Sequence, residues 1–228
     1  MNPHWDGFIA MVPWVLDHDS VVKVGASKPP GSWEPASVAF TALFPTLAQL
    51  LKEAFVASID LDGNAYVLFT WQRKDGSFCS WLSPTPSIAP PTSLYADHQI
   101  LLASFGGIVE RSNDPVWWVL NHNDALTERE ARHDATFIRD YAWAFETASV
   151  EIPIDLKQFY SIAREANANT TLCHRTSGDV MLFATDHAFD HVEVLPGCPD
   201  YTLYRFHGAQ RFRDWVNAIA RQWRDGVI

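Results

Sequence analysis

Cysteine, basic side chains and long apolar runs are all scarce in this chain of 228 residues. Three cysteines are too few for a disulfide framework, and such a sparse, odd count is typical of a reducing cytoplasm. Lysine and arginine number 17 against 27 acidic residues, a formal net charge of −10. This balance disfavours binding to nucleic acid or to an anionic membrane surface.

No segment has the composition of a membrane span or an export signal. The longest uncharged stretches, 35–51 and 76–96, both contain serine, threonine and proline. The apolar stretch 7–16 is interrupted by Pro13, and Asp6 stands where a secretory signal carries basic residues. We therefore expect a soluble cytoplasmic protein.

Hydrophobic residues make up 47% of the chain, and ten tryptophans and fourteen phenylalanines supply a large aromatic load. This is the composition of a globular protein with a sizeable core. The prolines between 84 and 91 are interpreted as a long surface loop, because the hydrophobic content is similar on both sides. We expect a single domain over 1–228.

The pattern of apolar residues and turn residues predicts an α+β fold. Helices are expected over 37–55 with a break near Pro45, 93–105, 127–145, 156–166 and 212–223. Strands are expected over 21–24, 57–61, 66–73, 78–82, 108–111, 116–120, 170–173, 179–184, 192–195 and 201–206. Because the strands come in hairpin-linked groups, they predict a mostly antiparallel sheet covered by helices.

Acidic residues concentrate between 110 and 200, where 16 acidic side chains face seven basic ones. Several lie on the predicted helix 127–145, interleaved with arginines, a pattern typical of a solvated face with i,i+3 and i,i+4 pairs. The other interpretation is a face for a basic partner. In the predicted strand 116–120, one of two adjacent tryptophans is a candidate anchor for a partner. The candidate partner-binding residues are Asp114, Trp118, Asp124, Glu128, Glu130 and Asp134.

Potential metal ligands gather near the end of the chain. A tetrahedral zinc site from Cys173, His187, His191 and Cys198 is conceivable. However, no Cys-x-x-Cys or His-Glu-x-x-His motif is present, and buried thiols usually behave as small apolar groups. The sequence also lacks a Gly-x-Ser-x-Gly motif and a phosphate-binding loop, so no catalytic residue and no cofactor are predicted.

From His98 to the end, the chain resembles the SUKH superfamily, whose bacterial members are mostly immunity proteins against polymorphic toxins. Three stretches carry the resemblance: 100–108, a helix running into a glycine turn, 170–189, a strand–turn–strand hairpin, and 212–223, a closing amphipathic helix. The resemblance implies an α+β fold that works by binding. It implies no shared functional residue, and it implies that the gene lies beside a toxin gene.

Three functions remain open from the sequence. The first is a cytoplasmic immunity protein that neutralises a toxin, such as a basic nuclease domain, through an acidic surface. The second is a small zinc-dependent hydrolase that uses the cysteine and histidine cluster. The third is a regulatory scaffold or adaptor for an endogenous protein.

Overall fold

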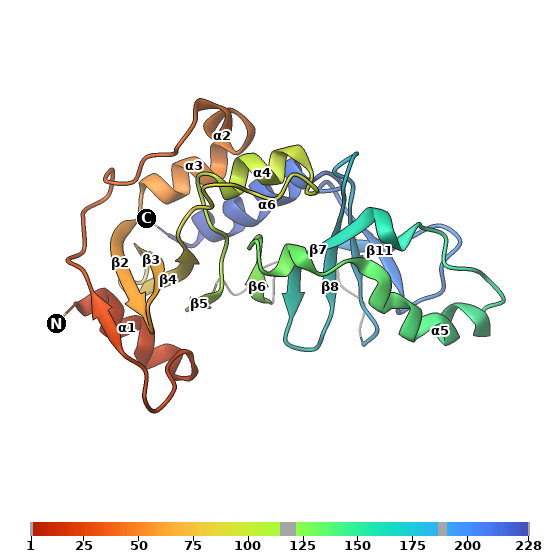
Figure 1. Cartoon of the computed structure of the whole chain (residues 1–228), viewed down its shortest axis with the longest axis horizontal. Helices are drawn as coiled ribbons and strands as arrows, with labels where there is room; N and C mark the ends of the chain where they lie inside the picture. The colour runs from red at the N-terminus through yellow and green to blue at the C-terminus, as the bar shows by residue number, and fades with distance from the viewer. Residues whose placement is uncertain (1, 115–121, 187–190, 228) are drawn as a thin grey trace.

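Two antiparallel sheets lie next to each other beneath a shared layer of helices in the computed structural model (Figure 1). The structure describes residues 2–114, 122–186 and 191–227. The α+β class is confirmed, with the hairpin-linked strands divided between two sheets.

The first sheet is a meander in which neighbours in sequence are neighbours in space, in the order β1-β2-β3-β4-β5. Its strands are β1 (Val22–Val24), β2 (Phe55–Leu61), β3 (Asn64–Gln72), β4 (Phe78–Pro84) and β5 (Glu110–Ser112). Asp62 and Gly63 join β2 to β3 with φ angles of 53° and 80°. Two consecutive positive φ angles are typical of the tight turn that matches strand twist, so the predicted hairpin is confirmed.

The second sheet has the order β10-β11-β9-β8-β7-β6. Its strands are β6 (His122–Ala125), β7 (Phe159–Glu165), β8 (Thr170–His174), β9 (Val180–Phe183), β10 (Val192–Val194) and β11 (Leu203–Phe206). The two sheets meet at Ile108 and Ala125, whose backbones exchange hydrogen bonds of 2.7 and 2.8 Å. The predicted hairpin at 170–184 is confirmed. The predicted strand 116–120, with Trp117 and Trp118, lies outside the described residues.

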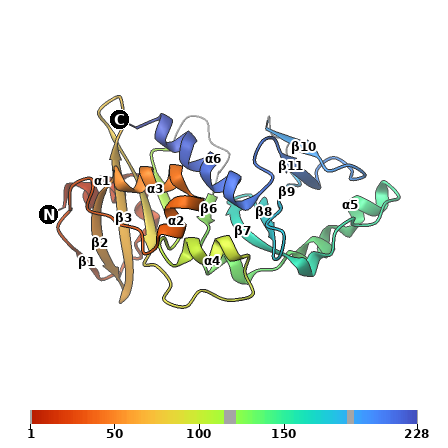
Figure 2. The same ribbon diagram turned by 90° about the horizontal axis from the view of Figure 1, so that it is seen from above.

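Six α-helices cover or flank the sheets, and several 3-10 turns connect them in the part of the chain that the structure describes (Figure 2). The helices are α1 (Pro3–Met11), α2 (Val38–Leu43), α3 (Pro45–Lys52), α4 (Ala96–Leu102), α5 (Ala142–Thr147) and α6 (Phe212–Asp225). Helix α6 contacts both sheets: Trp223 packs on Trp71 and Trp81, and Trp215 packs on Phe206. One main apolar core therefore contains residues from both sheets.

The second sheet is covered on both faces, which explains one wrong prediction. The segment 156–166 is a 3-10 turn (Leu156–Gln158) followed by strand β7, and not a helix. Phe159 faces an outer apolar cluster, whereas Tyr160 and Ile162 face the main core under α6. A strand buried on both faces has no alternation of apolar and polar residues, so its sequence imitates that of a buried helix.

The predicted α-helix 127–145 is wrong up to residue 141, and only its last residues, 142–145, belong to an α-helix. Thr127 accepts a hydrogen bond from the Glu130 amide at 3.0 Å, as an N-cap should. The chain then forms 3-10 turns at Glu130–Arg132 and Ala135–Tyr141 before α5 begins. Between these turns, Asp134 forms a β-bridge with Tyr160, which holds the segment against β7. Tertiary pairing has overridden the local helical pattern.

Candidate functional site

Two of the predicted partner-binding acids are buried in ion pairs within the protein. Asp124 pairs with Arg129 at 2.6 Å and accepts a hydrogen bond from the Thr127 hydroxyl. Glu130 pairs with Arg164 at 3.1 Å and accepts a hydrogen bond from Ser161. Both side chains are largely removed from solvent, so the solvated helix face expected for them is a wrong prediction.

The remaining predicted acids are partly exposed and locally engaged. Asp114 pairs with Arg111 at 2.9 Å, and burial raises the pKa of its carboxyl. Glu128 accepts a hydrogen bond from Ser87 at 2.9 Å. Hydrogen bonds from the hydroxyl and amide of Thr136 lower the pKa of Asp134. Trp118 lies outside the described residues, so the six candidates are not shown to form one surface.

A different acidic surface protrudes at the end of the molecule farthest from the N-terminus (Figure 1). We define the acidic arm as residues 139–155, which include α5 and carry four acidic side chains and one basic side chain. Three exposed carboxylates of the arm, Asp140, Glu146 and Glu151, form no hydrogen bond or ion pair with the described residues. They are therefore available to a partner.

Trp143 is an exposed residue of α5 and lies between Asp140 and Glu146 in the sequence. It is 63% exposed, one of the largest exposed fractions among the tryptophans of the described chain. The opposite side of the same segment is anchored, because Phe145 is buried and Tyr141 packs edge-on against Phe183 at 5.1 Å. A firmly held element thus presents an aromatic side chain of the type that dominates binding energy in protein interfaces.

The exposure of this tryptophan has a signal in the sequence itself. Tyr141 and Phe145 are four residues apart and share one helix face, so residue 143 falls on the opposite face. The inward stripe therefore implied that Trp143 points outward.

The cysteines do not form a reactive or metal-binding group in the described part of the chain. Burial raises the pKa of the Cys79 and Cys173 thiols to about 12, so both stay protonated and weakly nucleophilic at neutral pH. Cys173 lies in the main core, whereas Cys198 packs against the outer cluster on the other face of the second sheet. His191 is exposed, and His187 lies outside the described residues. No cluster of three potential metal ligands occurs among the described residues.

His98 is a fully buried titratable group that serves the fold. Its Nε2 lies 3.1 Å from the Leu126 carbonyl oxygen, and its Nδ1 lies 3.0 Å from the Tyr160 hydroxyl. A carbonyl can only accept, so Nε2 donates to Leu126, and in the neutral ring Nδ1 then accepts a hydrogen bond from the Tyr160 hydroxyl. Burial lowers the pKa of His98 from 6.5 to about 4.

Acidification is therefore expected to destabilise the protein through His98. The folded state resists protonation, so its stability is intact above about pH 6.5 and falls as the pH approaches 4, by about 3 kcal/mol. Urea unfolding at about pH 7.5 and about pH 4 measures this loss. Because other groups titrate too, the test is the difference from His98→Gln, which we expect to lose about 3 kcal/mol less than the wild type over this interval. An equal loss in both proteins would contradict this role.

None of the helices in 2–114, 122–186 and 191–227 has the length and apolar character needed to cross a bilayer. Comparisons of the chain with family models, with curated proteins and with solved structures give no match.

Proposed function

We propose that this chain is a binding protein that neutralises a toxin domain by direct contact, and that the acidic arm is its contact surface. The observation that carries the proposal is Trp143, exposed on an anchored helix among carboxylates without partners in the described chain. The resemblance to SUKH immunity proteins supports the same class of function.

The distribution of charge favours a basic partner. The acids buried near the junction of the sheets, Asp124 and Glu130, are already neutralised by arginines. Asp140, Glu146 and Glu151 of the arm form no ion pair with the described residues, and the arm keeps four acidic side chains against one basic side chain. Such a surface accelerates the encounter with a basic protein such as a nuclease domain and discriminates against acidic ones.

The structure favours neither alternative function. A zinc hydrolase would use His187, His191 and one of the two cysteines, because Cys173 and Cys198 lie on opposite faces of the second sheet; His187 lies outside the described residues, and no cluster of three potential metal ligands occurs among those described. A scaffold for an endogenous protein would use the same arm, and it differs from an immunity protein in the identity of the partner.

Charge reversal on the arm tests the contact surface. Asp140→Lys, Glu146→Lys and Glu151→Lys combined should slow association with a basic partner about tenfold or more and flatten its salt dependence. The measurement is capture of a basic protein from a lysate of the source cells on the tagged chain, followed by association kinetics at several salt concentrations.

The matched control reverses three exposed acids at the opposite end of the molecule, Asp6→Lys, Asp17→Lys and Asp19→Lys, with the same change in net charge. If the two triple variants slow association equally, overall charge and not the arm governs the encounter, and the assignment of the surface is wrong.

A further inference from the structure

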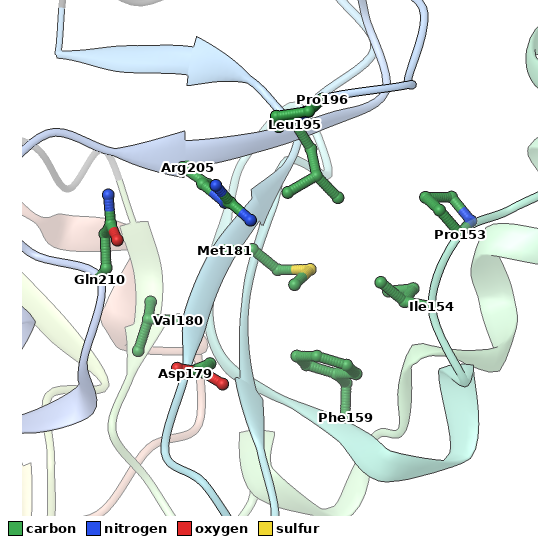
Figure 3. A pocket seen from close by; sticks show the side chains of 10 residues that line it. All are labelled: Pro153, Ile154, Phe159, Asp179, Val180, Met181, Leu195, Pro196, Arg205 and Gln210. Atoms are coloured by element: carbon green, nitrogen blue, oxygen red, sulfur yellow. The ribbon is translucent and has the colours of Figure 1, made fainter.

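A cavity of about 450 Å³ opens on the face of the second sheet that is opposite α6 (Figure 3). Its walls come from segments far apart in the sequence, including β9, β11 and the chain that follows α5. The volume lies within the range of small-molecule sites, about 300–1,000 Å³. Pro153 and Ile154 of the acidic arm line the cavity, whereas the exposed carboxylates of the arm, Asp140, Glu146 and Glu151, do not.

One side of the cavity is apolar. Phe159, Met181 and Leu195 are buried members of the outer apolar cluster, and Ile154 packs against the same cluster. In Figure 3, Met181 lies at the centre, between Leu195 above and Phe159 below, with Ile154 across the opening. These side chains offer a surface for a hydrocarbon group.

The other side of the cavity is polar, and Arg205 is its principal charge. The Asp179 carboxylate is already paired with Arg211 at 2.9 Å and accepts a hydrogen bond from Ser177. Glu193 lies opposite Arg205 in the strand pair, but its carboxylate is directed to His207, at 3.9 Å. Arg205 therefore has no ion-pair partner within the described residues.

Gln210 adds a second polar group beside this guanidinium. Its backbone carbonyl accepts a hydrogen bond from the Val180 amide at 2.8 Å. Its side-chain amide makes no hydrogen bond to any residue that the structure describes, and Figure 3 shows it on the same side of the cavity as Arg205. An unpaired cation and a free amide next to an apolar wall complement a ligand that is anionic at one end only.

We propose that this cavity binds a small free monocarboxylate that carries an aryl or alkyl group. The carboxylate accepts hydrogen bonds from the Arg205 guanidinium, whose planar geometry suits a carboxylate, and the Gln210 amide donates another. The hydrocarbon group packs on Met181, Phe159 and Ile154. A cation would be repelled by Arg205, and a polyanion or sugar would leave polar groups against the apolar wall.

Methionine methyl NMR provides a direct test, because the chain has only three methionines. Met181 lines the cavity, and Met11, 54% exposed and on α1, is an internal reference. On titration with 3-phenylpropionate, the Met181 resonance should shift and saturate while Met11 stays in place. The neutral analogue 3-phenylpropanamide should bind about tenfold more weakly, since it lacks the charge that Arg205 recognises.

Two arginine variants complete the test. Arg205→Gln should weaken 3-phenylpropionate binding about tenfold and leave the amide unaffected. Arg221→Gln removes another exposed arginine without a partner in the described chain. It should change neither the affinity for 3-phenylpropionate nor the affinity for 3-phenylpropanamide. A Met181 resonance that does not move, or one that responds identically in wild type and Arg205→Gln, would overturn the proposal. No protein partner is needed, so failure here is independent of the proposed function.

Discussion

Replacing Gly107 with alanine is expected to destabilise the fold by about 3–5 kcal/mol. Gly107 has a φ of +89°, and a Cβ atom there would lie 2.6 Å from the Leu126 carbonyl carbon and the Thr127 amide nitrogen. This is the point where the two sheets meet, next to the bridge between Ile108 and Ala125. The clash is with backbone, which cannot move aside as a flexible side chain would. Urea unfolding measures the change.

Gly31→Ala is the matched control. Gly31 has a φ of +84°, but a Cβ atom added there would have no neighbour within 4 Å. An alanine at this position would have the backbone strain without the clash. We therefore expect Gly31→Ala to lower the free energy of unfolding by about 1–2 kcal/mol. Equal losses in the two variants would show that the close approach at the sheet junction is not what makes glycine necessary at 107.

Replacing Trp223 with alanine is expected to lower the free energy of unfolding by about 3–5 kcal/mol, as for other large aromatic residues of a core. Its ring is 1% exposed and lies 4.9 Å from the Trp81 ring and 5.9 Å from the Trp71 ring, centroid to centroid. The substitution leaves a cavity where α6 packs on the first sheet. Thermal and urea unfolding should both show the loss.

Trp143→Ala is the control, and it separates packing from binding. Because Trp143 is exposed, its removal should change the free energy of unfolding by less than about 0.5 kcal/mol. The same variant should weaken partner binding markedly if the acidic arm is the contact surface. If Trp143→Ala lowered the free energy of unfolding as much as Trp223→Ala does, the description of α5 as an anchored element with a free outer face would be contradicted.

The sequence predicts elements whose pattern is set locally. Helix α6 follows from Phe212, Trp215, Ile219 and Trp223 at helical spacing, and the β2–β3 hairpin follows from its turn residues. Strand β7 is hidden, because burial on two faces removes the alternation that marks a strand. At the other end of the chain, helix α1 is missed, although Asn2 caps it and Pro3 occupies its first turn.

The candidate sites depend on tertiary structure to a greater degree. Nothing local distinguishes the acids Asp124 and Glu130, which pair with arginines inside the protein, from Glu146 and Glu151, which have no such partner among the described residues. The cavity at Arg205 is assembled from four separated segments, so no window of sequence contains it. Trp143 is the exception, since the inward stripe on its own helix implies its exposure.

The central claim is that the chain neutralises a toxin through the acidic arm, and growth rescue tests it most directly. The products of the adjacent genes are expressed in a heterologous host, alone and together with this chain or its arm-reversed variant. We predict that one neighbour arrests growth, that the wild-type chain restores it, and that the variant with Asp140, Glu146 and Glu151 changed to lysine does not. The account would be contradicted if the wild-type chain failed to relieve the growth arrest. It would also be contradicted if the arm-reversed variant relieved the arrest as well as the wild-type chain does.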